Sequence, residues 1–176
     1  MSAVSFMVIG LPRSGTTWAA NWLTAGEVFC AHDPLWTAGR RDLDRAVADS
    51  PAAVRGVSCT GLWRWPEFVN DHPARKLIVH RPASEVRRSM QRLGLPALPL
   101  LAANSLWKLN GMHVDHRELF DPAAAPALWA YLTGGLPFDA ARHAMLRPVH
   151  VEPAFSRVAV RRDVVRKMFG ERRARA

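Results

Sequence analysis

The feature that most constrains the fold of this chain is the segment Gly10–Thr17, which reads Gly-Leu-Pro-Arg-Ser-Gly-Thr-Thr. It follows an apolar run, Val4–Ile9, and leads into Thr16–Ala25, where apolar residues recur with helical spacing. A glycine-bounded loop between a buried strand and a helix can turn its backbone N–H groups inward around a phosphate or sulfate oxygen. The segment therefore predicts a βα unit with an anion-binding loop.

The rest of the chain repeats this alternation of short apolar runs with longer amphipathic stretches, which is typical of βα units around a parallel sheet. Further strands are predicted over Val54–Ser58, Lys76–His80 and Gly111–His116. Further helices are predicted from Pro82 onward and over Leu98–Leu109, Pro122–Leu132 and Phe138–Leu146. We expect an α/β fold of the P-loop type, a three-layer sandwich with a mostly parallel central sheet.

Length and composition favour one folded domain. The chain has 176 residues, of which 49% are hydrophobic and 22% charged, and this excludes an intrinsically disordered protein. Residues 157–176 carry a net +6 of the total charge of +9. We expect a domain over residues 1–156, followed by a basic helix or tail over 157–176 that is either a solvated surface or a contact for an anionic ligand or nucleic acid.

The sequence also limits the compartment and the metal chemistry. No apolar run approaches the roughly 20 residues of a membrane-spanning helix, and no basic leader precedes the first apolar segment. Cys30 and Cys59 are too few for a disulfide framework and lack the spacing of a zinc site. We therefore expect a cytoplasmic protein with reduced thiols, no membrane partner and no metal site.

The loop departs from the frame of nucleotide-hydrolysing proteins, G-x-x-x-x-G-K-[ST], at one informative position. Thr16 occupies the place of the lysine, and the cation has moved to Arg13. The strand over Lys76–His80 leads into Arg81, so no acidic residue follows it to hold Mg²⁺. These substitutions argue against hydrolysis of a nucleoside triphosphate.

Two motifs together resemble the sulfotransferases that use 3′-phosphoadenosine 5′-phosphosulfate (PAPS). Gly10–Trp18 is similar to the loop of that family that holds the 5′-phosphosulfate, and the resemblance assigns this role to Arg13, Ser14, Gly15, Thr16 and Thr17. Leu77–Pro82 and Ser89 resemble the strand, turn and helix that hold the 3′-phosphate, a role that would fall to Arg81 and Ser89. The resemblance extends from Phe6 to Leu146 with gaps, in a chain shorter than typical members.

The resemblance implies sulfuryl transfer from PAPS to an acceptor hydroxyl or amine, with Arg13 as the cation near the leaving oxygen and a base for the acceptor proton. The histidine of the cytosolic members falls at Cys59, whereas the base of the protein-tyrosine sulfotransferases aligns with His32, which Asp33 follows. A histidine can accept a proton near neutral pH, and an aspartate only if its pKa is raised. The alternative for His32 is a structural role in the turn before Pro34. On the predicted strand Lys76–His80, the His80 side chain should point away from that of Arg81, because neighbouring strand residues alternate in direction.

Other functions remain open at this point. A small nucleotide or metabolite kinase could use the same scaffold, and a non-catalytic nucleotide-binding or nucleic-acid-binding module could use the loop and the basic tail. The acceptor would be a small molecule, and Trp36, Trp63 and Trp65 near predicted loops suggest one with an aromatic or apolar face.

Overall fold

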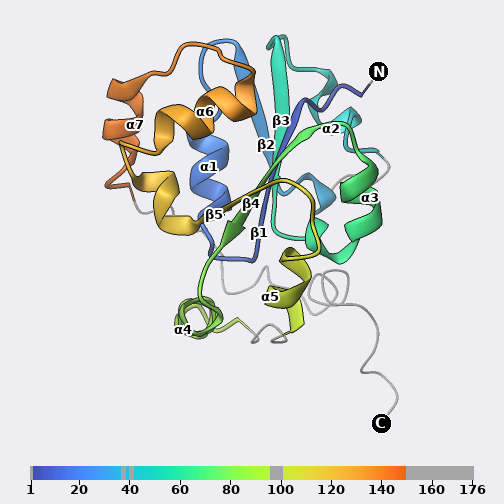
Figure 1. Ribbon diagram of the computed structural model, residues 1–176, viewed down its shortest axis with the longest axis vertical. Helices are drawn as coiled ribbons and strands as arrows, with labels where there is room; N and C mark the ends of the chain where they lie inside the picture. The colour runs from blue at the N-terminus through green and yellow to red at the C-terminus, as the bar shows by residue number, and fades with distance from the viewer. Residues whose placement is uncertain (1, 37–38, 40–41, 96–100, 150–176) are drawn as a thin grey trace.

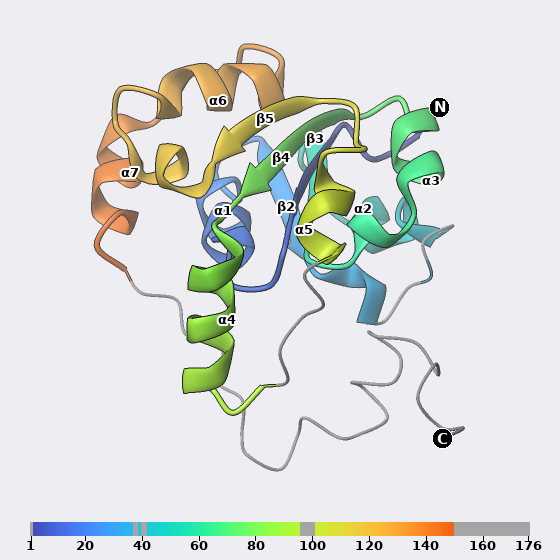
Figure 2. The same ribbon diagram turned by 60° about the horizontal axis from the view of Figure 1, so that its bottom comes forward.

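The computed structural model describes residues 2–36, 39, 42–95 and 101–149, and Figures 1 and 2 show how their elements are arranged. Five strands form one sheet in the order β2-β3-β1-β4-β5, and every neighbouring pair is parallel. The strands are β1 (Phe6–Gly10), β2 (Val28–His32), β3 (Val54–Cys59), β4 (Arg75–His80) and β5 (Met112–Asp115). The expected α/β class with a parallel sheet is confirmed.

Helices cover both faces of the sheet and make three layers (Figure 1). One face packs against α1 (Thr16–Trp22), α6 (Ala125–Thr133) and α7 (Ala140–Leu146). The other packs against α2 (Arg45–Ala48), α3 (Pro66–Asp71) and α5 (Leu101–Leu106). Helix α4 (Ala83–Arg92) extends beyond the end of β4, as Figure 2 shows. Short 3₁₀ turns complete the layers: η1 (Pro34–Trp36), η3 (Leu62–Arg64) and η4 (His116–Phe120).

The central strand β1 is buried over its whole length, which explains its unbroken apolar sequence. Phe6 on β1 lies beside Gly56 on β3 in the sheet register. A Cβ atom at position 56 would lie 2.2 Å from the Phe6 ring. Position 56 therefore requires glycine, because the Phe6 ring fills the space that a Cβ atom would take.

The strand β2 was not predicted, because the first helix was expected to continue to Ala25. The helix instead ends at Trp22, and the Thr24 hydroxyl donates to the Ala20 carbonyl over 2.8 Å. Ala25 and Val28 then exchange two backbone hydrogen bonds of 3.0 and 2.9 Å, which turn the chain back into the sheet. This tight turn supplies the edge strand that ends at His32.

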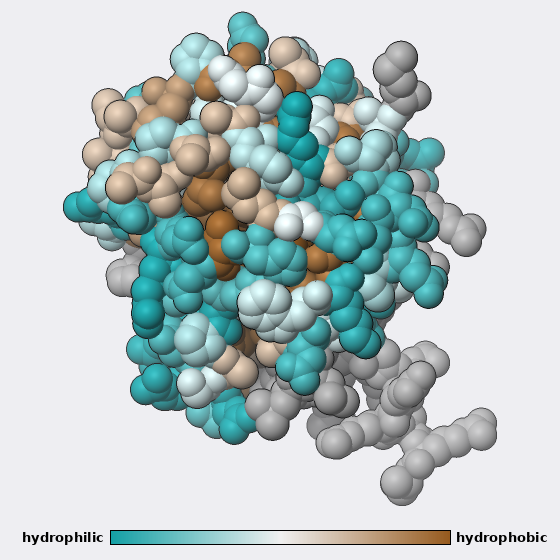
Figure 3. Space-filling view, in the orientation of Figure 1, coloured by the Kyte–Doolittle hydropathy of each residue, from teal (hydrophilic) through white to brown (hydrophobic). Residues whose placement is uncertain are grey.

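The other predicted elements exist with shifted ends, and two short helices, α2 and α3, were missed. In α4, Val86 and Met90 are buried while Arg87, Arg88 and Arg92 are exposed, as their spacing predicts; Leu93 is half-buried. Over the described residues, the helices are all too short or too polar to cross a membrane. The face in Figure 3 is mostly hydrophilic, with apolar side chains gathered over α6 and α7. The basic segment 157–176 lies outside the described residues, as does the end of the predicted domain.

Candidate functional site

The carboxyl ends of all five strands meet at one edge of the sheet, because the strands are parallel. Each strand is followed directly by residues with polar or charged side chains. These are the loop Leu11–Gly15 after β1, Asp33 after β2, Thr60 after β3, Arg81 after β4 and His116 after β5. In open α/β sheets ligands bind outside this edge. The edge is therefore the candidate site.

The loop after β1 makes a tight turn with an unusual backbone. Arg13 and Gly15 both adopt left-handed conformations, with φ of 69° and 88°. The Ser14 side chain is fully buried, yet its hydroxyl has no hydrogen-bond partner among the described residues. A buried polar atom without a partner costs stability, so its persistence here is a reason to expect a ligand.

The two sequence motifs meet at Arg13. The Arg81 guanidinium donates through Nη1 to the Arg13 carbonyl, and the Arg13 Nε donates to the Ser89 hydroxyl over 3.0 Å, between residues 76 positions apart. Ser89 is only 4% exposed, so its hydroxyl is held by the packing of α4. The structure thus brings the predicted residues Arg13, Arg81 and Ser89 together at the candidate site.

Beside them lies an ionic cluster formed by Arg81, Glu85, His116 and Arg117, of which only Arg81 was singled out by sequence. The two carboxylate oxygens of Glu85 accept from different guanidiniums, from Arg81 Nε over 3.1 Å and from Arg117 Nη2 over 3.0 Å. The hydrogen bond from Arg81 holds the pKa of Glu85 below its ordinary value. His116 Nε2 lies 3.7 Å from Glu85, and burial lowers the pKa of this histidine. The i,i+4 spacing of Arg81 and Glu85 is the one signal that could have revealed part of this cluster.

His32 and Asp33 are at the end of β2, on the other side of the loop. His32 Nε2 lies 3.0 Å from the Thr17 hydroxyl and 3.4 Å from Asp33 Oδ2, and 34% of the His32 side chain is exposed. Asp33 accepts from the Thr60 backbone N–H over 2.6 Å and from the Thr60 hydroxyl over 3.0 Å. His32 is therefore in contact with the first turn of α1 through Thr17, and Thr60 fixes the carboxylate beside it.

His80 points away from Arg81, as the alternation of strand residues predicts, and belongs to an aromatic stack formed by His80, Trp107 and His113. The Trp107 ring lies 3.9 Å from the His80 ring, centroid to centroid, at an interplanar angle of 21°. His80 Nε2 and His113 Nδ1 are 2.8 Å apart, and His113 Nε2 is 2.9 Å from the Leu109 carbonyl.

The contacts of this stack fix the positions of its protons. A carbonyl can only accept, so His113 carries its proton on Nε2 and, when neutral, accepts on Nδ1 from the Nε2–H of His80. Burial and the neighbouring His113 lower the pKa of His80. The three rings are therefore held together by stacking and by one hydrogen bond between the two imidazoles.

Cys59, Trp63 and Trp65 lie at the end of β3 and in the segment that follows it. Burial raises the pKa of the Cys59 thiol, so this residue is poorly suited to act as a base or nucleophile. Trp63 donates its indole N–H to the Thr60 carbonyl over 2.8 Å, and Trp63 and Trp65 are half-buried against the hydrophobic core. Their proposed role in binding an acceptor stays a prediction, and the side chain of Trp36 lies outside the described part of the structure.

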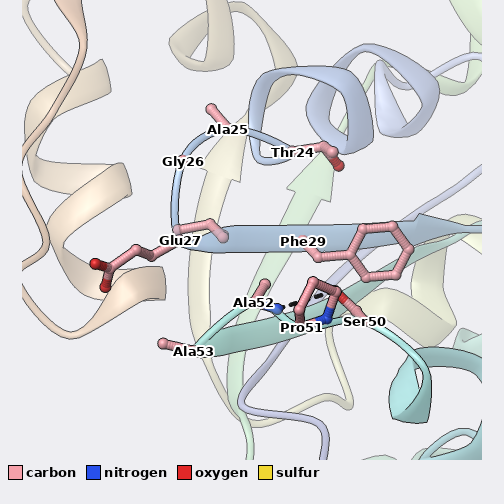
Figure 4. A pocket seen from close by; sticks show the side chains of 10 residues that line it. Thr24, Ala25, Gly26, Glu27, Phe29, Ser50, Pro51, Ala52 and Ala53 are labelled. Atoms are coloured by element: carbon pink, nitrogen blue, oxygen red, sulfur yellow. Dashed lines mark hydrogen bonds between the residues drawn. The ribbon is translucent and has the colours of Figure 1, made fainter.

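A surface hollow of about 590 Å³ lies at the opposite edge, where β2 and β3 begin (Figure 4). It is lined by Thr24–Phe29 and by Ser50–Ala53, and Glu27 is its one ionisable lining residue. Figure 4 shows the Glu27 carboxylate turned outward. This hollow offers no group suited to chemistry and does not compete with the candidate site.

Comparison with known proteins gives no assignment: no family model, no curated protein and no solved structure matches this chain.

Proposed function

We propose that this protein transfers the sulfuryl group of PAPS to the hydroxyl or amine of a small-molecule acceptor. The observation that carries the proposal is the junction of Arg13, Arg81 and Ser89, where residues from two distant motifs converge on one loop. PAPS carries anionic groups on both sides of its ribose. A site with a phosphate loop and a second arginine beside it is suited to such a ligand.

Each residue has a role in this proposal. Arg13 and the amides and hydroxyls of Ser14, Gly15, Thr16 and Thr17 bind the 5′-phosphosulfate, and Arg81 and Ser89 bind the 3′-phosphate. In the reaction, the acceptor oxygen or nitrogen bonds to sulfur while the bond between sulfur and the 5′-phosphate oxygen breaks. Arg13 stabilises the charge that develops on the leaving oxygen, and adenosine 3′,5′-bisphosphate is released.

The proposed proton acceptor is His32. Its Nε2 is 3.0 Å from the Thr17 hydroxyl, so the imidazole already lies next to the loop. Asp33, fixed by Thr60, stabilises the imidazolium that forms when the proton of the acceptor arrives. We further propose that the protein acts in the cytoplasm, since Cys30 and Cys59 are unpaired thiols.

Titration calorimetry with four nucleotides tests the proposal. Adenosine 3′,5′-bisphosphate should bind more tightly than AMP, ADP or ATP, and Arg81→Ala should remove that preference. The matched control is Arg88→Ala, which removes an exposed arginine of the neighbouring helix α4 and should keep the preference. Equal affinity for AMP and the bisphosphate would contradict the proposal, and Mg²⁺-dependent turnover of ATP would favour a kinase instead.

A binding module is the other alternative, and it has its own signature. Steeply salt-dependent binding of DNA or RNA that disappears when residues 157–176 are deleted would favour a nucleic-acid-binding role. Under the proposal, the same deletion leaves the preference for the 3′-phosphate unchanged.

A further inference from the structure

The ionic cluster contains a second arginine that the proposed function does not use. Arg117 follows β5 and reaches back to Glu85 on α4, between residues 32 positions apart. Its side chain is 71% exposed, whereas Glu85 is 21% exposed. An ion pair between an exposed arginine and a half-buried carboxylate contributes little stability, so the position of Arg117 calls for another explanation.

Glu85 fixes the relative position of two guanidiniums. Because Arg81 and Arg117 bind different oxygens of one carboxylate, they are held side by side, on neighbouring segments that follow β4 and β5. Arg81 uses its Nε on Glu85 and its Nη1 on the Arg13 carbonyl. The other N–H groups of the two guanidiniums have no partner among the described residues, so they are available to a ligand.

We propose that Arg117 is a second cation for the 3′-phosphate and that Glu85 is the positioning residue that aligns Arg81 and Arg117. A phosphomonoester carries nearly two negative charges and three acceptor oxygens, more than one guanidinium can match. Two aligned guanidiniums bind such a group with both forks and select it over a ligand that lacks it. The inference rests on the proposed function and adds the residues that determine its specificity.

The neighbouring acids do not fill this position. The Asp115 carboxylate accepts from the Arg117 backbone N–H over 2.9 Å, and the Glu118 carboxylate accepts from the Asp115 backbone N–H over 2.8 Å. Both are thereby committed to the cap of η4. Glu85 is the single acid that pairs with the two guanidiniums in the described part of the chain.

The test measures the ratio of affinities for adenosine 3′,5′-bisphosphate and AMP, which isolates the contribution of the 3′-phosphate. Arg117→Ala should lower this ratio by roughly 10-fold, the effect of losing one charge-assisted contact, and Arg117→Lys by less. Arg88→Ala should leave the ratio within about 2-fold of wild type, because that arginine does not contact Glu85. An unchanged ratio in Arg117→Ala would overturn the inference while leaving the proposed function intact.

Glu85→Gln separates positioning from simple charge. If Glu85 only repelled the ligand, removing its charge would tighten binding of the bisphosphate. We expect the opposite, a loss of several-fold in the affinity ratio, because glutamine replaces one of the two acceptor oxygens by an NH₂ group, which cannot accept from the guanidinium beside it. Tighter binding by Glu85→Gln would contradict the assigned role.

Two controls are needed, one for the folding of each variant and one for the nucleotide preference of the wild-type protein. A thermal unfolding curve for each variant establishes that it is folded before its affinities are compared. A wild-type protein with no preference for the 3′-phosphate would refute the proposed function and, with it, this inference.

Discussion

The ionic cluster and the aromatic stack lie on two sides of the carboxyl end of β4, and their polar groups are partnered differently. On one side, Arg81 enters the ionic cluster, where guanidinium N–H groups outnumber the acceptors around them. On the other, His80 enters the aromatic stack, where His80 and His113 share a hydrogen bond and His113 also contacts the Leu109 carbonyl. The comparison teaches that two adjacent residues at the end of one strand enter different environments: Arg81 joins a group of charged side chains, and His80 joins a group of stacked rings.

The largest expected effect separates the two sides by ligand affinity. Arg81→Ala should weaken binding of adenosine 3′,5′-bisphosphate by about 100-fold, because charge-assisted contacts to the ligand are lost. Trp107→Ala should change the same dissociation constant by less than about 2-fold. Calorimetry on both variants checks this, and a large loss in Trp107→Ala would show that the aromatic side also binds the nucleotide.

The second effect lies in the loop, where stability and binding should move in opposite directions. Ser14→Ala removes a buried hydroxyl without a partner and should raise the free energy of unfolding by about 1 kcal/mol. The same substitution should weaken binding of the bisphosphate by up to about 10-fold, because that hydroxyl is a proposed ligand contact. Urea unfolding and calorimetry measure the two quantities. A destabilised variant would mean that Ser14 serves the fold alone.

A third effect concerns the stability of the aromatic side. Trp107 is 66% exposed, so its contribution comes mainly from the His80 and His113 rings beneath it. Trp107→Ala should cost about 1 kcal/mol of the free energy of unfolding. The matched control is Met145→Ala, since Met145 is 61% exposed, and it should cost less than half as much. Equal losses in urea unfolding would show that the stack adds nothing.

The smallest effect is a pH dependence. Because the pKa of His80 is lowered in the folded protein, the unfolded chain binds the additional proton first as the pH falls. Stability should therefore fall as the pH decreases through about 6.5, the ordinary histidine value, toward the lower folded value. The groups facing His80 are Trp107, His113 and Asp115.

His80→Asn tests this linkage. It should flatten the decline by a few tenths of a kcal/mol, since the group is partly solvated. Burial also lowers the pKa of His72 and of His116, so part of the decline should remain. Unfolding free energies measured between pH 5 and pH 8 decide the point, and an identical slope in the variant would contradict it.

The sequence predicts the centre of the sheet well and its edges less well. The strand β1 is buried over its whole length and β4 is buried from Lys76 to Val79, so each contains an apolar run that the sequence reveals. The edge strand β2 contains only four apolar residues before His32, and an apolar run this short does not distinguish a strand from a helix. Its existence depends on the turn at Ala25–Val28, a local arrangement that periodicity does not reveal.

In the candidate site, too, some residues could be predicted from the sequence and others could not. Arg13 and Arg81 could be expected at one site from sequence because parallel strands bring their carboxyl ends to one edge. Ser89 was expected beside Arg81 because of the resemblance to the PAPS-dependent sulfotransferases. Glu85 and Arg117 could not, because their contact joins segments after different strands through the directions of long side chains. Spacing along a chain carries no information about such directions.

The hydrogen bond from Arg81 to the Arg13 carbonyl has a consequence for folding. The carbonyl of Arg13, whose backbone is left-handed, accepts from a residue that directly follows β4, so we expect the loop to gain this restraint only when β4 has paired with β1. A fragment that stops before residue 75 would contain every loop residue and still lack this restraint. Nucleotide binding would then report completion of the central sheet, and its appearance during refolding should coincide with, rather than precede, protection of the β4 amides from hydrogen exchange.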